Sequence, residues 1–192
     1  MRNVVLGSTL MLLSASCSAK LPPVEVTRFR VSEAVAAGAI STSALGDTDG
    51  TTIEFRTYDA AVKRELARLG YAEGSNPAYS AEIGYSREAR DRIAKSSPVT
   101  IGIGGGSFGR NVGVGLGTSF GIGGDKSRKT IISRLEVRLK RAADGAVVWE
   151  GRAQTEAPSN APSAQPGLAA DKLSRALFEG FPGESGKTIL VP

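Results

Sequence analysis

The sequence predicts an α+β fold: an antiparallel β-sheet with two packed helices and a Gly-rich β-hairpin. Apolar residues recur at helical spacing over residues 51–70 and again over 168–179. Apolar and polar residues alternate over residues 131–152, which is the period of a strand with one buried face. With 192 residues, 41% hydrophobic and 22% charged, the chain has the size and composition of one globular domain.

The first helix is expected between Thr51 and Gly70. Thr51 and Glu54 have the spacing of a capping box, which satisfies free backbone N–H groups at a helix start. Gly70 is a typical C-terminal stop. Between them one apolar stripe follows spacings of three and four: Phe55, Tyr58, Val62, Leu66 and Leu69.

The other elements follow from shorter patterns. Val24, Val26 and Arg28 share one face of an early strand. A run rich in Pro, Ser and Ala indicates a mobile linker. These patterns predict strands at 24–31, 79–86 and 188–191, a polar stretch at 41–50, a linker at 157–167, and a second helix at 168–179.

One hairpin can be assigned down to its register. Asp144-Gly145 marks its turn. A two-residue turn would set inward residues opposite outward ones, whereas a three-residue loop with Gly145 in the left-handed conformation restores the match. That loop predicts three cross-strand pairs, and it leaves Val147 and Trp149 facing inward. The pairs are Arg138 with Glu150, Glu136 with Arg152, and Leu139 with Trp149.

Residues 99–124 are rich in glycine and predict a second hairpin. From Val112 to Ile122 every second residue is apolar or Thr, and the residues between are Gly or Ser, which is a strict period of two. Glycine offers no side chain to pack, so a bare strand face is weak. We therefore expect another layer, a partner or a second copy of the chain to cover it.

The N-terminus predicts export and a lipid anchor. Arg2, the apolar run 4–13 and the small residues 14–16 are the three parts of a signal peptide, and the run is too short to span a bilayer. Cys17 follows directly, and residues 13–17 resemble the lipobox of bacterial lipoproteins, whose cysteine is acylated. We expect a signal peptide at 1–16, lipidation of Cys17, a tether at 17–23 and one domain at 24–192. The alternative is an ordinary secreted protein with an incidental cysteine.

The residue types available exclude much enzyme chemistry. The chain has no His and one Cys, so it has no imidazole base, no His-based metal site and no internal disulfide. Three short motifs resemble known nucleotide-binding or catalytic motifs, but each lacks a neighbouring element or residue that the site requires. Gly104, Gly106 and Gly109 precede a strand rather than a helix; Gly186-Lys187-Thr188 lacks the first glycine of a P-loop; and Gly117-x-Ser119-x-Gly121 has no His base. We expect no catalytic residues, no cofactor and no metal, with a His-independent enzyme as an alternative.

Several pieces, taken in order, resemble a bacterial lipoprotein family known as domain of unknown function four-one-three-six. They are the strand at Val24 and Val26, the helix end at Gly70-Tyr71, the strand-turn-strand around Asp144-Gly145, and a closing helix that runs into Phe181-Pro182. Ala78 departs from the family, which usually has an acidic residue there. The resemblance implies an α+β fold and a cell-envelope location, and it supplies no activity and no catalytic residues.

The expected function is therefore non-catalytic. We expect an outer-membrane lipoprotein that faces the periplasm, because Ser18 lacks the acidic sorting signal, and that serves as a scaffold or binds an envelope partner. The Gly-rich hairpin could serve this role by binding a partner or a second copy of the chain. The net charge of +5 leaves a second hypothesis, a binder of anionic envelope polymer or lipid through outward Arg and Lys. Nucleic acid is not expected as a partner.

Overall fold

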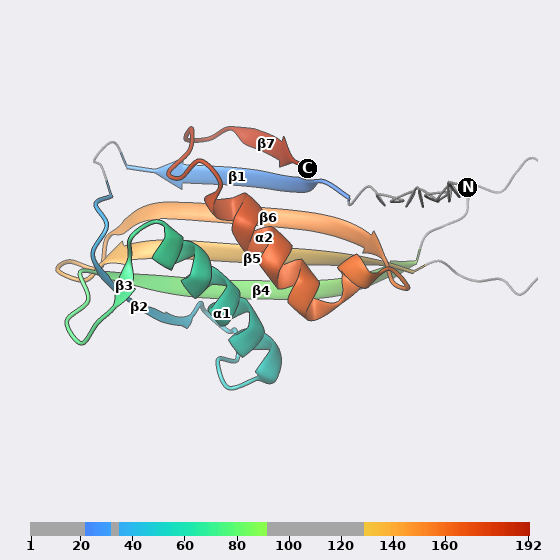
Figure 1. Ribbon diagram of the computed structural model, residues 1–192, viewed down its shortest axis with the longest axis horizontal. Helices are drawn as coiled ribbons and strands as arrows, with labels where there is room; N and C mark the ends of the chain where they lie inside the picture. The colour runs from blue at the N-terminus through green and yellow to red at the C-terminus, as the bar shows by residue number, and fades with distance from the viewer. Residues whose placement is uncertain (1–21, 32–34, 92–128) are drawn as a thin grey trace, which may run out of the picture.

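The computed structural model describes residues 22–31, 35–91 and 129–192. In these ranges the chain forms a seven-stranded sheet in the order β3-β2-β4-β5-β6-β1-β7, with two α-helices and one short 3-10 helix (Figure 1). The elements are β1 (Val24–Arg30), β2 (Ala39–Ala44), α1 (Ile53–Arg68), β3 (Ala72–Glu73), β4 (Tyr79–Asp91), β5 (Lys129–Arg141), β6 (Val147–Pro158), η1 (Pro162–Ala164), α2 (Pro166–Phe178) and β7 (Thr188–Val191).

The α+β class is confirmed, but the sheet is mixed rather than antiparallel. β2 pairs in parallel with β3 on one side and with β4 on the other, where Ile40 lies opposite Tyr79. Parallel neighbours need a crossover connection, and α1 supplies the crossover between β2 and β4. The polar stretch at 41–50 was assigned no strand, yet its first four residues belong to β2, in which Ile40 is the one buried residue.

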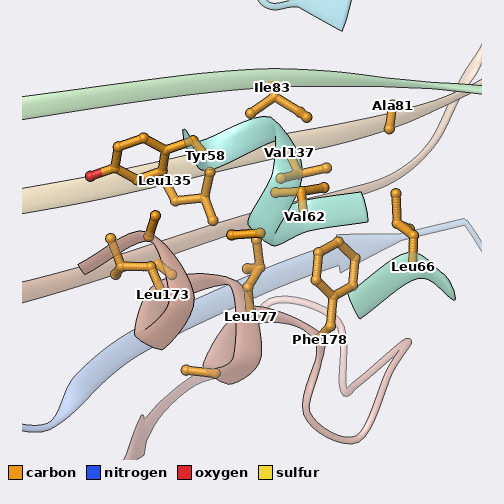
Figure 2. Packing of buried hydrophobic residues seen from close by; sticks show 14 of the residues in the cluster. Tyr58, Val62, Leu66, Ala81, Ile83, Leu135, Val137, Leu173, Leu177 and Phe178 are labelled. Carbon is orange, nitrogen blue, oxygen red and sulfur yellow. The ribbon is translucent and has the colours of Figure 1, made fainter. Parts of the chain in front are cut away.

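Both helices lie side by side over the same face of the sheet (Figure 1). The strand side chains beneath them alternate with outward ones, so the core is a single layer between sheet and helices. Figure 2 shows side chains of α1 and α2 meeting those of β4 and β5 there. The labelled members include Tyr58, Val62, Leu66, Ala81, Ile83, Leu135, Val137, Leu173, Leu177 and Phe178, all of them buried.

The apolar stripe of α1 is confirmed, but its cap lies one residue further on. Thr52, not Thr51, is the N-cap, and its hydroxyl accepts from the backbone N–H of Phe55 at 3.0 Å. The Thr51 hydroxyl instead donates to Asp49 at 2.7 Å. The capping box with Glu54 was therefore wrong, because two consecutive threonines offer the same signal. At the other end Gly70 has φ +89°, as expected for a helix stop.

The β5–β6 hairpin has the predicted register. Arg138 lies opposite Glu150, and Glu136 lies opposite Arg152. Leu139 faces Trp149, and Gly145 has φ +70°. The three-residue loop was wrong, since the backbone N–H of Arg141 donates to the carbonyl of Ala146 at 2.9 Å and four residues form the turn. The prediction for Val147 was wrong for the same reason: a register shift after Leu139 turns this residue outward, with 43% of its surface exposed, and buries Val148 instead.

Two other boundaries differ from the sequence patterns. β4 continues to Asp91, because β5 is equally long and pairs with it throughout. The expected mobile linker at 157–167 is an ordered segment: β6 runs to Pro158 and a 3-10 turn follows at Pro162–Ala164. The second helix and the last strand are confirmed.

Several predictions fall outside the described residues. The signal peptide at 1–16, Cys17 and most of the tether lie there, and so does the Gly-rich hairpin at 99–124. Among the described residues, no helix is both long enough and apolar enough to cross a membrane.

Candidate functional site

The two faces of the sheet carry different chemistry. Side chains on the face opposite the helices are mostly charged or polar, and no described helix covers them. We call this surface the open face. Its members on the four central long strands are Glu25, Thr27 and Phe29 (β1), Glu82, Gly84, Ser86 and Glu88 (β4), Arg134, Glu136, Arg138 and Lys140 (β5), and Glu150, Arg152 and Gln154 (β6).

A groove of about 570 Å³ hollows the middle of the open face. It runs across β1, β4, β5 and β6 and is bounded by the loop that follows β2. Its lining mixes polar, charged and apolar groups, among them Thr27, Leu45, Arg134, Glu136, Arg152 and Gln154. This groove is the candidate site, because polar, charged and apolar side chains from several strands line one concavity.

One row of residues across the sheet forms the floor of the groove. The backbone N–H of Leu45 donates to the carbonyl of Ile83 at 2.9 Å, which places Leu45 beside Gly84. A Cβ atom at Gly84 would lie 3.2 Å from Leu45 Cδ2, so the missing side chain leaves room for leucine. Glu136 lies opposite Gly84, and Arg152 comes next along the row. The row therefore runs from an apolar end to a charged one.

The basic side chains around the groove are paired with acidic or amide groups. Arg138 contacts Glu136 at 2.7 Å, and Arg152 contacts Glu150 at 2.7 Å and Glu136 at 3.6 Å. Further out, the carboxylates of β4 hold two more cations: Lys140 contacts Glu82 at 2.9 Å and Arg134 contacts Glu88 at 2.7 Å. Arg134 also donates to the Gln154 side chain at 2.7 Å. The open face thus presents interleaved charges rather than a field of one sign.

Comparison with known proteins identifies the family. Residues 34–183 match the profile of a family described as "Domain of unknown function (DUF4136)". The chain belongs to the DUF4136 family. A relative from Zymomonas mobilis, an uncharacterized protein, is 29% identical over 88% of this chain and 80% of its own length.

Solved structures show more distant similarities to this DUF4136 chain. The PelC dodecamer from Paraburkholderia phytofirmans is 14% identical, with a TM-score of 0.42 over 80% of this chain and 94% of its own. A PDZ domain protein from Parabacteroides distasonis is 12% identical, with a TM-score of 0.49 over 90% of this chain and 40% of its own. A Caulobacter crescentus protein, provisionally designated a lipoprotein, is 18% identical, with a TM-score of 0.39 over 73% and 85%.

The buried tyrosines of the DUF4136 domain lie on the helix side of the sheet, away from the groove. Tyr58 stacks on Tyr85, with ring centroids 4.6 Å apart. Burial raises the pKa of Tyr58 to about 12. Burial likewise raises the pKa of Tyr71 to about 12, and its hydroxyl donates to the carbonyl of Val35 at 3.3 Å. Both phenols therefore stay protonated at neutral pH and serve the packing of the core.

Of the motifs examined in the sequence, one lies in the described residues. Lys187 of the Gly186-Lys187-Thr188 motif contacts Glu184 at 2.8 Å, and Thr188 opens β7 rather than a helix, so no phosphate loop forms. The other two glycine motifs and Cys17 lie in ranges that the structure does not describe. Within the described ranges, no three or more His, Cys, Asp or Glu side chains cluster in a way that could hold a metal ion.

The groove itself was not predicted from the sequence. The sequence pattern paired Glu136 and Arg138 with residues of β6, but it did not show that the outward charges of four strands surround one concavity. The missed signal is that four strands carry polar residues at the same period, so their outward faces add up to one surface.

Proposed function

We propose that this DUF4136 protein is a non-catalytic binding module of the cell envelope. Acyl chains on Cys17 hold it to the outer membrane on the periplasmic side, and the open face binds a protein partner. The observation that carries the proposal is the groove of paired charges on the sheet face that neither helix covers.

The pattern of charges favours a protein over a polyanion as the partner of this face. Glu25 and Glu136 line the groove together with Arg134 and Arg152, so a uniformly anionic polymer would meet repulsion as well as attraction. Leu45 at one end of the groove and the exposed Phe29 of β1 add apolar surface to these mixed charges. Protein interfaces combine apolar and polar surface in this way.

The same contacts support a non-catalytic role. General acid–base catalysis needs a side chain free to exchange a proton with a substrate. Arg134 and Arg152 are held in ion pairs with neighbouring glutamates, and guanidinium groups do not release protons near neutral pH. The chain has no His to act in their place.

Support for the anchor comes from the sequence. Cys17 directly follows the small residues at the end of the apolar run, and two or more acyl chains hold a protein stably on a bilayer. Mass spectrometry of the purified protein tests this step directly. A mature chain that begins at Cys17 with added fatty acid supports the anchor, and one that begins elsewhere contradicts it.

The partner proposal is tested by cross-linking the native lipoprotein in membranes and recovering it by affinity. We compare the wild type with Glu136→Arg, which sets a third cation against Arg138 and Arg152, and with Glu184→Arg as a charge-matched control on a distant loop. A partner recovered with the wild type and the control but lost with Glu136→Arg supports the open face. Equal recovery with all three proteins, or no partner above background, contradicts it; thermal melts confirm that each variant is folded.

One observation favours the second hypothesis, a binder of anionic envelope polymer or lipid. Residues 92–128 contain five basic residues and one acidic residue, so the positive charge of the chain is concentrated there. Binding of this kind falls steeply with salt, because ionic attraction to a polyanion is screened. Retention on an anionic polysaccharide column that survives Glu136→Arg and is lost at high salt would support this hypothesis.

A further inference from the structure

The point at which the chain enters the folded domain is held against α2. The ammonium group of Lys172 donates to the carbonyl of Pro22, and the Thr155 hydroxyl donates to the carbonyl of Pro23 at 3.1 Å. These two contacts attach the start of the domain to α2 on one side and to β6 on the other. The length of any tether between the membrane and the folded domain is therefore counted up to Pro22.

That tether is short compared with the domain. Cys17 precedes Pro22 by five residues, which span at most about 17 Å when fully extended. β4 has 13 residues and is roughly 43 Å long. If Cys17 is acylated, the surface around Pro22 must stay close to the bilayer, and the far end of the domain cannot turn towards it.

The surface beside Pro22 carries an exposed leucine and two cations. Leu168 is 50% exposed and lies one helical turn before Lys172. Leu168, Lys172 and Arg175 have the spacing i, i+4, i+7, so they form one stripe on α2. Leu173 and Leu177, which are buried, point into the core from the other side of the helix.

A second exposed apolar residue lies in the same neighbourhood. Ile53, the first residue of α1, is 78% exposed. Arg87 contacts Glu54 at 3.3 Å and donates to the carbonyl of Ala164, so α1 and α2 both begin beside this one arginine. Ile53 and Leu168 therefore occupy the first turns of two helices that start together.

We propose that the stripe Leu168, Lys172 and Arg175 is a membrane-docking surface, on which Leu168 enters the lipid interface and the exposed Arg175 meets anionic headgroups, while Lys172 holds Pro22 beside them. Amphipathic helical surfaces bind bilayers through this combination of apolar burial and attraction to anionic lipid. The inference rests on the proposed acylation of Cys17. Since α2 lies on the covered face of the sheet, docking through α2 leaves the open face accessible to a partner.

The test places a reporter at the stripe in the full-length acylated protein. Acylation consumes the thiol of Cys17, so Leu168→Cys introduces the thiol that an environment-sensitive fluorophore will label. The labelled protein is reconstituted in vesicles of phosphatidylethanolamine and phosphatidylglycerol that carry a spin-labelled quencher lipid. The matched control is Ala143→Cys, an exposed position in the turn at the opposite end of β6.

Docking predicts that quenching at position 168 exceeds quenching at 143 by roughly twofold or more, because an interfacial helix lies about 5–10 Å into the headgroup boundary. It also predicts that Arg175→Gln reduces quenching at 168 in anionic vesicles and has no effect in phosphatidylcholine vesicles. Equal quenching at 168 and 143 in protein that floats with the vesicles overturns docking and leaves the anchor intact. Protein that does not float, and carries no fatty acid on Cys17, overturns the anchor and the docking surface together.

Discussion

The Arg28 guanidinium lies against the backbone carbonyl of Leu177, with Nε donating to it at 2.9 Å. Its Nη2 atom donates to the carbonyls of Ala176 and Glu179, each at 2.8 Å. The last carbonyls of a helix lack partners and carry partial negative charge. Arg28 therefore caps α2 from the middle of β1, where its side chain is 5% exposed. Burial lowers the pKa of Arg28, partly offset by the nearby Glu179 carboxylate, yet arginine remains charged at neutral pH.

Arg28→Met should destabilise the domain strongly. The substitution keeps an apolar stem in the core but removes all three hydrogen bonds and leaves their acceptors without the charged donor, so we expect a loss of about 3 kcal/mol in the free energy of unfolding. Urea unfolding followed by circular dichroism measures it. Arg56→Met, at an exposed position of α1, is the control and should cost less than about 0.5 kcal/mol. Equal stability of the two variants would show that the cap contributes little.

Gly183 and Gly186 should differ in their tolerance of alanine, although both have φ +79°. A Cβ at Gly183 would lie 2.7 Å from Arg28 Cδ, whereas a Cβ at Gly186 would meet nothing within 4 Å. We expect Gly186→Ala to cost about 1 kcal/mol for the left-handed conformation alone. Gly183→Ala should cost about 1–3 kcal/mol more, because the buried arginine must move. Urea titrations of the two variants measure the free energy of unfolding, and equal losses would contradict the close contact between Gly183 and Arg28.

Removing a buried hydroxyl should cost stability where the hydroxyl is hydrogen-bonded and should cost none where it has no partner. Ser174 is fully buried, and its hydroxyl has no hydrogen-bond partner among the described residues. Ser174→Ala should leave the stability unchanged or raise it by up to about 1 kcal/mol, since it removes an unpaired polar group and improves helix propensity. Thr155→Val, which loses the bond to Pro23, should instead cost about 1 kcal/mol. A strong loss with Ser174→Ala would reveal a partner for that hydroxyl.

Alkaline pH should destabilise the domain through its buried tyrosines. In the folded state the pKa of Tyr58 and of Tyr71 is raised to about 12, whereas the pKa of a tyrosine in the unfolded chain is about 10. A raised folded-state pKa means that the stabilisation is fully present below pH 10 and is lost as the pH rises from 10 towards 12. Urea unfolding at neutral pH and at stepped alkaline pH measures this loss, and Tyr58→Phe should make the decline shallower. If Tyr58 and Tyr71 ionise at about pH 10 in the folded protein, as judged by ultraviolet absorbance of the wild type and of Tyr→Phe variants at these two positions, the prediction is wrong.

Much of the fold could be predicted from the periodicity of residues along the chain. The alternation of β5 and β6 around Asp144-Gly145 was enough to set Glu136 opposite Arg152, because a hairpin's register depends on its turn and on which face is buried. The stripe of α1 from Phe55 to Leu66 followed in the same way from helical spacing. The threonine pair at the start of α1 shows the limit, since neighbouring residues of one type share one signal and only the backbone shows that Thr52 forms the cap.

The candidate site depended on pairings that no local pattern encodes. Glu136 and Leu45 belong to one row of the open face because β2 joins β4 in parallel through the α1 crossover, and β2 itself shows little alternation. The mixed sheet and its groove therefore could not be derived from residue spacing along single strands.

The sequence by itself determined the α+β class, the β5–β6 register and the apolar faces of both helices, because each depends on residues a few positions apart. Only the tertiary structure decided that Arg28, on the inward face of its strand, caps α2 about 150 residues away, that β2 runs parallel to β4, and that the charges of four strands surround one groove. The physical reason is distance along the chain: contacts between remote segments are selected by the free energy of packing the whole domain, which short patterns do not contain.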